Sequence, residues 1–474
     1  MSNPSAAQPA PVEAPTAIIL YGGTGDLAKR LVLPALWELF TRGLLPDRFT
    51  LIGNGRGDVA HEDFKAHIHD VLVEFASIED EKEFADFASH VLFAGGGFKD
   101  SDPGSLLDVI KQAEEDLGEE VQLLHYLAIP PVAFEETTKA IKAHDLAKNA
   151  KAVYEKPYGT SLQSFHELDD LVHSVFDEQQ VYRIDHFLGK EATQNLYLTR
   201  FANRMFGDLW NREHIAQVQI DVPETLDVAD RAGFYDATGA SLDMLVTHLF
   251  QVAAEISLEP PTSMRAEDVQ FARESVIAAF RPLNPDEVVL GQYKSYRETE
   301  GIPDDSETDT FVAARLWIDT DRWRGVPFLL RTGKMMAASA QKVSLVFRPA
   351  DGPLHSINAA ANALAFDLKG NGAIEVQLTV KKPGPDPIPA ESCTSLSLSN
   401  VSSGSMTAYT SLIHDVLSGD RSLFTSSLGL EAAFKAFAPM LSDVRPKVEI
   451  YEDGTWGPVA AQDLTGDVGW LLGQ

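Results

Sequence analysis

The chain has 474 residues, of which 44% are hydrophobic and 23% charged, as is ordinary for a soluble globular protein. This length exceeds what one compact core accommodates, so two domains are expected. The formal net charge of −31 repels nucleic acids and anionic membranes, and no apolar run is long enough to span a bilayer. We therefore expect neither nucleic acid nor membrane as a partner.

The N-terminal segment and the cysteine content bear on location. Residues 1–15 are rich in alanine and proline and lack the basic and apolar regions of a secretory signal, so a disordered tail is expected there. The single cysteine, Cys393, excludes an internal disulfide and a zinc site built on cysteine pairs. These features favour a reducing, cytoplasmic environment.

Residues 16–186 alternate between short apolar runs and helical patterns. The strand-like runs cover 16–21, 49–53, 122–129, 151–154 and 180–184. The helical patterns cover 26–40, which Pro34 interrupts, 62–75 and 106–117. Alternation of this kind predicts a parallel, doubly wound, Rossmann-like sheet, the architecture of a dinucleotide-binding domain.

The pattern changes after about residue 186. Strand-like runs then cover 216–222, 310–319, 328–332, 342–347 and 373–381. Helical patterns lie near 240–256, 408–418 and 428–441, and 382–389 has the composition of a loop. The run at 216–222 alternates like a half-buried strand. Residues 187–474 are therefore predicted to form a larger α+β domain with a mainly antiparallel sheet.

A glycine-rich turn, Gly22-Gly23-Thr24-Gly25, lies between the first strand and the first helix. Glycines let a phosphate approach the backbone, and the helix N-terminus offers free N–H groups. The spacing departs from the usual GxGxxG pattern, so a plain strand-to-helix turn is an equal alternative. Arg56 follows the next strand and suits the 2′-phosphate of NADP, the alternative being a solvated loop arginine.

The segment Tyr182 to Lys190 combines a strand end with several charges. Asp185 ends the strand and a helix is expected from about Gly189, so His186 and Lys190, four residues apart, could share a helical face. Two cationic donors placed there would suit a phosphate dianion. A surface loop with solvated charges is the alternative interpretation.

His248 lies in an apolar helical pattern, where a hydrogen-bonded core histidine is the plain interpretation and a general base is the functional one. Asp243 stands in the first turn of the same pattern. In α-helical geometry the two side chains are about 140° apart, so they need not touch.

Eight segments, taken in chain order, resemble the glucose-6-phosphate dehydrogenase family. They are 22–29 (GGTGDLAK), 155–159 (EKPYG), 183–191 (RIDHFLGKE), 203–204, 210–212, 231–236 (RAGFYD), 322–334 and 451–458. The resemblance covers about residues 17–470. It implies oxidation of D-glucose 6-phosphate at C1 to 6-phospho-D-glucono-1,5-lactone with NADP, the first step of the oxidative pentose phosphate pathway. It also implies a homodimer, or a tetramer built from dimers, assembled through the larger sheet.

The resemblance implies a role for each matching residue. His248 corresponds to the general base and Asp185 to the carboxylate that orients it. The sugar phosphate ligands correspond to Lys156, His186, Lys190, Glu224, Asp243 and Lys334. The cofactor ligands correspond to Gly22, Gly23, Thr24, Gly25, Asp26, Leu27, Arg56 and Lys156. A local positive patch of Lys156, Arg183, His186 and Lys190 would offset the negative charge of the whole chain. No metal is implied.

Four positions depart from the family pattern. Phe187 replaces a tyrosine, which removes a hydroxyl near the substrate phosphate. Gly57 replaces a larger polar residue after Arg56, which weakens the case for strict NADP preference. Thr247 replaces the asparagine before the base. Residues 335–340 contain no second lysine, and Lys342 is the next candidate.

Four alternative functions are compatible with parts of the sequence. A sugar oxidoreductase of a broader class would share the Glu-Lys-Pro segment but would lack the Asp185-His186…Lys190 set. A sugar-phosphate or NADP sensor, or a structural subunit, would have no need of His248 and Asp185. A divergent paralogue could use NAD or another sugar phosphate.

Overall fold

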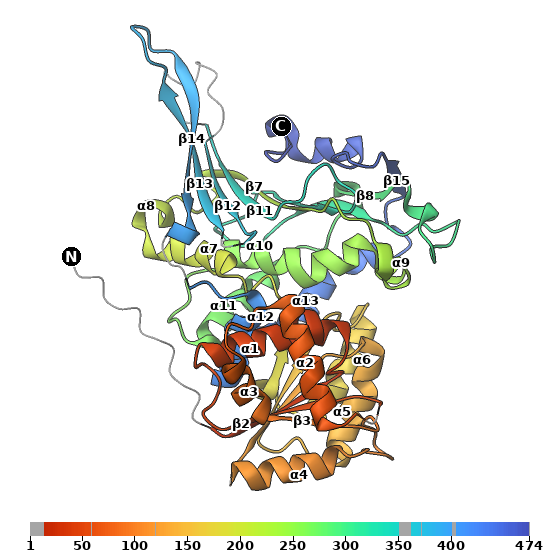
Figure 1. Cartoon of the computed structure of the whole chain (residues 1–474). Helices are drawn as coiled ribbons and strands as arrows, with labels where there is room; N and C mark the ends of the chain where they lie inside the picture. The colour runs from red at the N-terminus through yellow and green to blue at the C-terminus, as the bar shows by residue number, and fades with distance from the viewer. Residues whose placement is uncertain are drawn as a thin grey trace, which may run out of the picture.

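The computed structural model describes residues 14–57, 59–118, 120–349, 362–370, 372–400 and 404–473. Most of the tail predicted at 1–15 therefore lies outside the described residues. Figure 1 shows two parts stacked on each other, a parallel sheet wrapped by helices and a larger sheet above it. Among the described residues, no helix combines the length and apolar character needed to cross a membrane.

The first sheet has six parallel strands in the order β3-β2-β1-β4-β5-β6, which confirms the predicted doubly wound architecture. The strands are β1 (Thr16–Tyr21), β2 (Phe49–Asn54), β3 (Val91–Ala94), β4 (Gln122–Leu127), β5 (Ala150–Tyr154) and β6 (Val181–Arg183). These strands are almost entirely buried. Such burial on both faces is why they read as continuous apolar runs.

Six helical segments cover the two faces of this sheet. They are η1 with α1 (Ala28–Val32 and Leu33–Thr41), α2 (His61–Phe75), α3 (Glu81–Ser89), α4 (Leu106–Leu117), α5 (Phe134–Ala143) and α6 (Leu162–His173). The break expected at Pro34 takes the form of a π-helical segment, η1, and Pro34 itself lies in the first turn of α1. The helix runs on from η1 into α1, and the wider π-helical turn before Pro34 accommodates a residue that lacks an N–H and crowds the preceding turn.

The second sheet has nine strands in the order β14-β13-β12-β11-β7-β10-β9-β8-β15. The strands are β7 (Ile215–Pro223), β8 (Val288–Tyr293), β9 (Phe311–Leu316), β10 (Phe328–Gly333), β11 (Lys342–Phe347), β12 (Ala363–Asp367), β13 (Ala373–Lys381), β14 (Pro389–Ser397) and β15 (Val448–Tyr451). Two neighbouring pairs, β7 with β10 and β8 with β15, are parallel and the others antiparallel.

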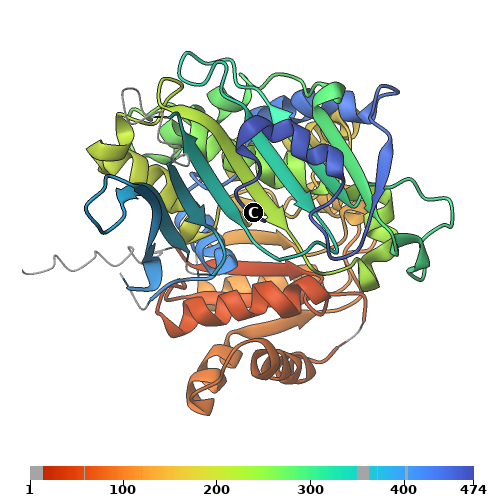
Figure 2. The same cartoon turned by 90° about the horizontal axis from the view of Figure 1, so that it is seen from above.

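Helices cover both faces of the central part of the second sheet. One face is covered by α7 (Glu191–Ala202), α9 (Ala232–Ala240), η5 (Ser241–Leu249) and α10 (Phe250–Ser257), and α8 (Arg204–Gly207) follows α7. Helices α11 (Ala266–Ile277) and α13 (Ser427–Phe437) pack beneath this layer, on α10 and η5. The C-terminal segment η10 (Val459–Val468) crosses the other face, as Figure 2 shows. The prediction of a half-buried strand at 216–222 is therefore wrong, because β7 is buried on both faces.

Helix α12 (Ala408–Ser418) ties the C-terminal part of the chain to the first sheet. It packs on α1, and Leu412 belongs to the same apolar cluster as Ile18 and Leu36. The Thr410 hydroxyl donates to Glu38 at 2.5 Å. A domain boundary after residue 186 stays a prediction, and α12 is a part of the chain beyond it that joins the first core.

Candidate active site

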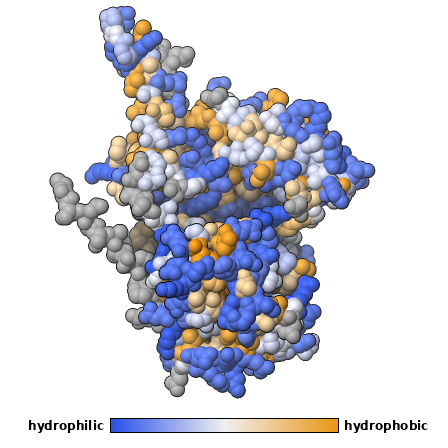
Figure 3. Space-filling model, viewed as in Figure 1, coloured by the Kyte–Doolittle hydropathy of each residue, from blue (hydrophilic) through white to orange (hydrophobic). Residues whose placement is uncertain are grey.

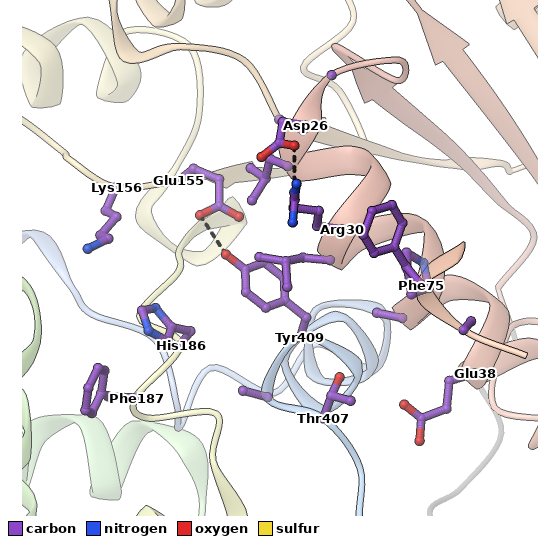
Figure 4. Close-up of a pocket in the computed structure, with 18 of the residues that line it drawn as sticks. Asp26, Arg30, Glu38, Phe75, Glu155, Lys156, His186, Phe187, Thr407 and Tyr409 are labelled. Carbon is purple, nitrogen blue, oxygen red and sulfur yellow. Dashed lines mark hydrogen bonds and ion pairs between the residues drawn. The ribbon is translucent and has the colours of Figure 1, made fainter. Parts of the chain in front are cut away.

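A cavity of about 1330 Å³ opens between the two sheets. Figure 3 shows the recess as a hydrophilic hollow between the two parts of the molecule, and Figure 4 shows its walls. One wall comes from the start of helix α1, one from the segment after β5, one from η5 and one from the start of α12. Its volume exceeds that of a typical pocket for one drug-sized ligand, so it has room for two ligands together.

Strand ends converge on this cavity, and topology explains why. The carboxyl ends of parallel strands meet at one edge of a sheet, and β1, β5 and β6 deliver Gly22, Glu155 with Lys156, and Asp185 to that edge. In the second sheet β7 and β10 are parallel neighbours, and Pro223 is paired with Gly333. Glu224 and Lys334, the next residues, therefore emerge side by side, and their side chains form an ion pair.

His248 and Asp185 form a buried dyad in the cavity wall. The Nδ1 atom of His248 lies 2.7 Å from Oδ1 of Asp185, and the two side chains are only 1% and 2% exposed. The backbone N–H of Phe187 donates to the same carboxylate oxygen at 2.8 Å. The Nε2 atom of His248 is buried without a hydrogen-bond partner. The dyad thus presents one free ring nitrogen to the cavity.

Burial sets the protonation of this dyad. Desolvation, followed by the charge of Lys156, holds the pKa of His248 well below its usual range. Burial raises the pKa of Asp185 to about 6, although His186 and a backbone N–H act in the opposite direction. At neutral pH the imidazole is therefore neutral and its carboxylate partner ionised. This is the state that a general base requires before it takes a proton.

Asp243 lies on the same face as His248, because η5 is a π-helix. Hydrogen bonds in a π-helix join residues five apart, so the fifth residue after Asp243 is stacked one turn above it. The separation of about 140° predicted for α-helical geometry is therefore wrong. The carboxylate of Asp243 accepts from Lys156 Nζ at 3.1 Å. Although burial raises the pKa of Asp243, Lys156 and His248 lower it below its usual value.

His186 and Lys190 do not share a helical face, which corrects that prediction. Helix α7 begins at Glu191, and residues 186–189 form a turn before it. The turn still places His186 in the cavity wall, where its ring centroid lies 4.5 Å from that of His248. The Lys190 ammonium lies 3.9 Å from the ring centroid of Phe187, a cation–π contact, and donates to Gln341. Burial lowers the pKa of Lys190 to about 8.

Arg183 is wrongly placed in the predicted positive patch. Its side chain is buried and pairs with Asp169 at 2.8 Å and Glu178 at 3.0 Å, away from the cavity lining. Lys342 is likewise excluded as the missing second lysine, because its Nζ pairs with Glu375 of β13 at 2.7 Å. Of the predicted cations, Lys156 and Lys334 line the cavity, and Lys190 lies behind Gln341, a lining residue to which it donates.

The glycine turn fits a phosphate-bearing cofactor. Gly22 has φ +74°, and a Cβ atom there would lie 2.5 Å from the carbonyl oxygen of Ala128. The residues Gly25, Asp26 and Leu27 at the start of the first helix line the cavity, and the first N–H groups of a helix have no intrahelical acceptor. Arg56 is exposed two residues beyond β2 and is not among the cavity-lining residues.

Several cavity residues carry no role in the sequence analysis. Glu155 is buried and accepts from Tyr126 at 2.8 Å and from Tyr409 of α12 at 3.3 Å, as Figure 4 shows for the second bond. Burial raises the pKa of Glu155 to about 7. Arg231 and Gln341 also line the cavity. Tyr409 lies far along the chain from the recognisable motifs, and Gln341, seven residues after the motif at 322–334, has no counterpart in the family pattern, so sequence gives no signal for either.

Asp185, His186 and His248 also satisfy a loose geometric test for a metal site, since one ligand atom of each lies within 4.8 Å of the others. The 2.7 Å contact between His248 and Asp185 is a hydrogen bond, with a proton between the two atoms. That bond leaves the free nitrogen of His248 facing away from the carboxylate, since the two ring nitrogens lie on different edges. The set is therefore arranged as a base and its partner.

The sequence matches two family descriptions over nearly its whole length. Residues 19–195 match the NAD-binding domain of glucose-6-phosphate dehydrogenase, and residues 197–470 match the C-terminal domain. The chain belongs to the glucose-6-phosphate dehydrogenase family. The NAD-binding match coincides with the six-stranded parallel sheet, and the C-terminal match contains the nine-stranded sheet and η5.

Relatives and solved structures of the family resemble the chain from end to end. It is 35% identical to the cytoplasmic glucose-6-phosphate 1-dehydrogenase 5 of Arabidopsis thaliana, covering 96% of this chain and 91% of that protein. It is 33% identical to the glucose-6-phosphate 1-dehydrogenase of Aggregatibacter actinomycetemcomitans, covering 94% and 95%. A glucose-6-phosphate dehydrogenase solved with its substrate glucose 6-phosphate superposes with a TM-score of 0.90 at 30% identity, covering 98% and 100%.

Proposed function

We propose that this glucose-6-phosphate dehydrogenase family member oxidises D-glucose 6-phosphate at C1 to 6-phospho-D-glucono-1,5-lactone, with NADP as the oxidant. The observation that carries the proposal is the free Nε2 atom of His248, which is buried at the cavity wall with Asp185 hydrogen-bonded behind it. A neutral imidazole in that position takes the proton of the C1 hydroxyl. Asp185 then stabilises the imidazolium that forms.

In the proposed reaction, the protein removes the proton of the C1 hydroxyl and the cofactor accepts the hydride from C1. The O–H bond at C1 breaks toward Nε2 of His248, and the C–O bond becomes the carbonyl of the lactone. The nicotinamide of NADP, when bound, supplies the acceptor for the C1 hydride. Lys156 lines the same cavity as His248, and Asp243, 3.1 Å from its ammonium, holds it in place as a positive charge. The chain's contribution is thus a base, its orienting carboxylate and the alignment of the two ligands.

The remaining ligands are assigned from the resemblance to the family together with their places in and around the cavity. His186 and Lys190 are proposed to hold the phosphate, and Glu224, Asp243 and Lys334 the sugar hydroxyls. The cofactor phosphates are assigned to the turn of Gly22, Gly23, Thr24, Gly25, Asp26 and Leu27. Arg56 is assigned to the 2′-phosphate of NADP, a position supported by its place directly after β2.

A sensor without catalysis is the second candidate function, but the site argues against it. Maintaining a buried histidine and carboxylate costs stability, which a binding protein has no need to accept. We also propose a homo-oligomer assembled through the second sheet. Its edge hairpin, β13 with β14, projects from the body in Figure 1 and exposes Leu378, Val380 and Leu396. Exposed apolar side chains gathered on a projecting hairpin favour cover by a partner subunit.

The proposed function is tested by following nicotinamide reduction with glucose 6-phosphate, using NADP and NAD in parallel. Faster reduction with NADP supports the proposal, and in Arg56→Ala the KM for NADP should rise about tenfold or more while that for NAD changes little. Equal loss with both cofactors would remove Arg56 from the 2′-phosphate site. No reduction with either cofactor, in a folded protein, would favour the sensor.

A further inference from the structure

The segment between β10 and β11 places one uncharged side chain at the phosphate end of the cavity. Residues 334–341 join the two strands, and of these only Lys334 and Gln341 line the cavity. Gln341 contacts Lys190, which we have proposed as a phosphate ligand. No position in this segment carries the second lysine that the family pattern led us to expect.

Hydrogen bonds to the chain after β7 fix the path of this segment. The N–H groups of Met336 and Ala340 donate to the carbonyls of Glu224 and Pro223, at 2.9 and 3.1 Å. The hydroxyl of Ser339 lies 2.8 Å from the Thr225 N–H, so this side chain is engaged in holding the segment. The position of Gln341 is therefore set by its neighbours and does not depend on a ligand.

Strand alternation separates Gln341 from Lys342. Successive side chains point to opposite sides of an extended chain. Lys342, at the start of β11, reaches Glu375 of β13, whereas Gln341 reaches Lys190 and the cavity. The basic residue of this pair therefore faces away from the site and the amide faces into it.

The partner of Gln341 determines how its amide is oriented. A lysine ammonium has donors and no acceptor, so the amide oxygen must face Lys190. The two hydrogens of Nε2 then point elsewhere, and among the described residues no acceptor lies within hydrogen-bond distance of them. Gln341 thus orients the Lys190 ammonium and also offers two free donors beside it.

We propose that Gln341 is a ligand of the substrate phosphate, donating from Nε2 while its carbonyl holds Lys190 in place. This inference rests on the proposed function, because it assigns the phosphate end of that same site. A neutral amide then stands beside Lys190, and residues 335–340 supply no positive charge there. The phosphate would then be bound by one lysine and by hydrogen bonds from the amide. Its electrostatic attraction to the site would be weaker than in a site with two lysines.

Three variants and one matched control test this assignment. Gln341→Leu keeps the size of the side chain but removes its hydrogen bonds, and the KM for glucose 6-phosphate should rise about tenfold or more. Its kcat should stay within about threefold, and kcat/KM for unphosphorylated glucose should not change. Gln341→Glu should raise that KM further, and Gln341→Lys should lower it. Lys342→Gln, one residue away but facing β13, should leave all of these constants unchanged.

Two results would overturn the assignment. One is a KM for glucose 6-phosphate within twofold of the wild-type value in Gln341→Leu. The other is an equal loss of activity toward glucose and glucose 6-phosphate, which would mean a structural role. If the wild-type protein reduces no cofactor, the proposed function fails, and calorimetric titration with inorganic phosphate decides the assignment without turnover. Equal phosphate affinity in wild type and Gln341→Leu would reject it.

Discussion

The bond between Nδ1 of His248 and Asp185 determines which nitrogen of the ring can act. An ionised carboxylate accepts hydrogen bonds only, so Nδ1 must carry the hydrogen and Nε2 must carry the lone pair. Phe187 packs 4.8 Å from the same ring, measured between centroids, and its backbone N–H holds the carboxylate. The tautomer is therefore set before any substrate arrives, and reorganisation during the reaction is small.

Replacing His248 should affect turnover far more than binding. In His248→Asn, kcat should fall by about two to four orders of magnitude because the proton acceptor is lost. The KM for glucose 6-phosphate should stay within a few-fold, since the proposed phosphate ligands are untouched. Steady-state kinetics measures both constants, and His69→Asn, at a histidine outside the cavity lining, is the control. A kcat within a few-fold of wild type would show that another group is the base.

The ammonium of Lys190 should make substrate binding sensitive to alkaline pH. Because burial lowers its pKa to about 8, Lys190 is charged below that pH and loses its charge above it. The KM for glucose 6-phosphate should therefore rise between about pH 8 and 9.5, by up to tenfold per pH unit, while the KM for NADP stays level. In Lys190→Gln the KM should be high throughout and nearly independent of pH. An unchanged alkaline limb in that variant would assign the titration to another group.

Phe187 illustrates how a departure from the family pattern changes one contact and keeps another. Phenylalanine has no hydroxyl to offer a phosphate, but its ring still lies 3.9 Å, at the centroid, from the Lys190 ammonium. The cation–π contact holds the lysine over the ring. The family pattern has a tyrosine hydroxyl at position 187 and a second lysine after Lys334, and this chain has neither. Gln341 lies against Lys190, next to both of these departures.

At the scale of elements, five of the six strands of the first sheet could be predicted, whereas the short strand β3 (Val91–Ala94) and the winding of η5 could not. Buried parallel strands give continuous apolar runs, which are visible in any window of the sequence. The segment Ser241–Leu249 has the apolar pattern of an ordinary helix, and nothing in that pattern marks i to i+5 bonding. Yet this winding places Asp243 beside His248 and Lys156. The turn at 186–189 was similarly hidden, because i, i+4 spacing alone does not require a helix.

The glycine turn after β1 depends on a backbone conformation and on close packing. Gly22→Ala should lower the free energy of unfolding by about 1–3 kcal/mol, because φ is +74° and the added Cβ would meet the Ala128 carbonyl at 2.5 Å. It should also raise the KM for NADP, as the turn is displaced from the cofactor phosphates. Thermal unfolding and steady-state kinetics measure the two effects.

Gly57→Ala is the matched control for this turn. The nearest atom to a Cβ there is a side-chain carbon of Val59 at 3.6 Å, an ordinary contact. Its stability should stay within about 0.5 kcal/mol of wild type. Equal stability of both alanine variants would mean that the turn relaxes freely and that the conformation of Gly22 has no special role.

At the scale of the whole molecule, the site is built from segments that the sequence separates widely. Glu155 follows a strand of the first sheet, whereas Tyr409 belongs to α12, more than 250 residues later in the chain, and their hydrogen bond fastens α12 to the edge of that sheet. Family motifs identify residues such as His248 and Lys156 but cannot show that Tyr409 or Gln341 faces them. Long-range contacts of this kind depend on the packing of α12 and of the β10–β11 segment, which local patterns do not encode.

Net charge and local charge act on the substrate over different distances. The formal charge of −31 repels a sugar phosphate from afar, whereas Lys156 and Lys334 in the cavity wall, and Lys190 behind Gln341, act at short range. Added salt shortens the screening length from about 30 Å at 0.01 M to about 10 Å at 0.1 M. The long-range repulsion is then largely screened, and contacts of a few ångströms inside the cavity are affected much less.

We therefore expect kcat/KM for glucose 6-phosphate to rise several-fold between 10 and 100 mM sodium chloride at saturating NADP, because encounter becomes faster. Glucose is neutral, so its kcat/KM should stay level over the same range and serves as the control. Stopped-flow or steady-state reduction assays measure both. A fall of kcat/KM for glucose 6-phosphate with added salt would mean that the cavity lysines dominate the field even at a distance. In that case the acidic surface would not limit substrate capture.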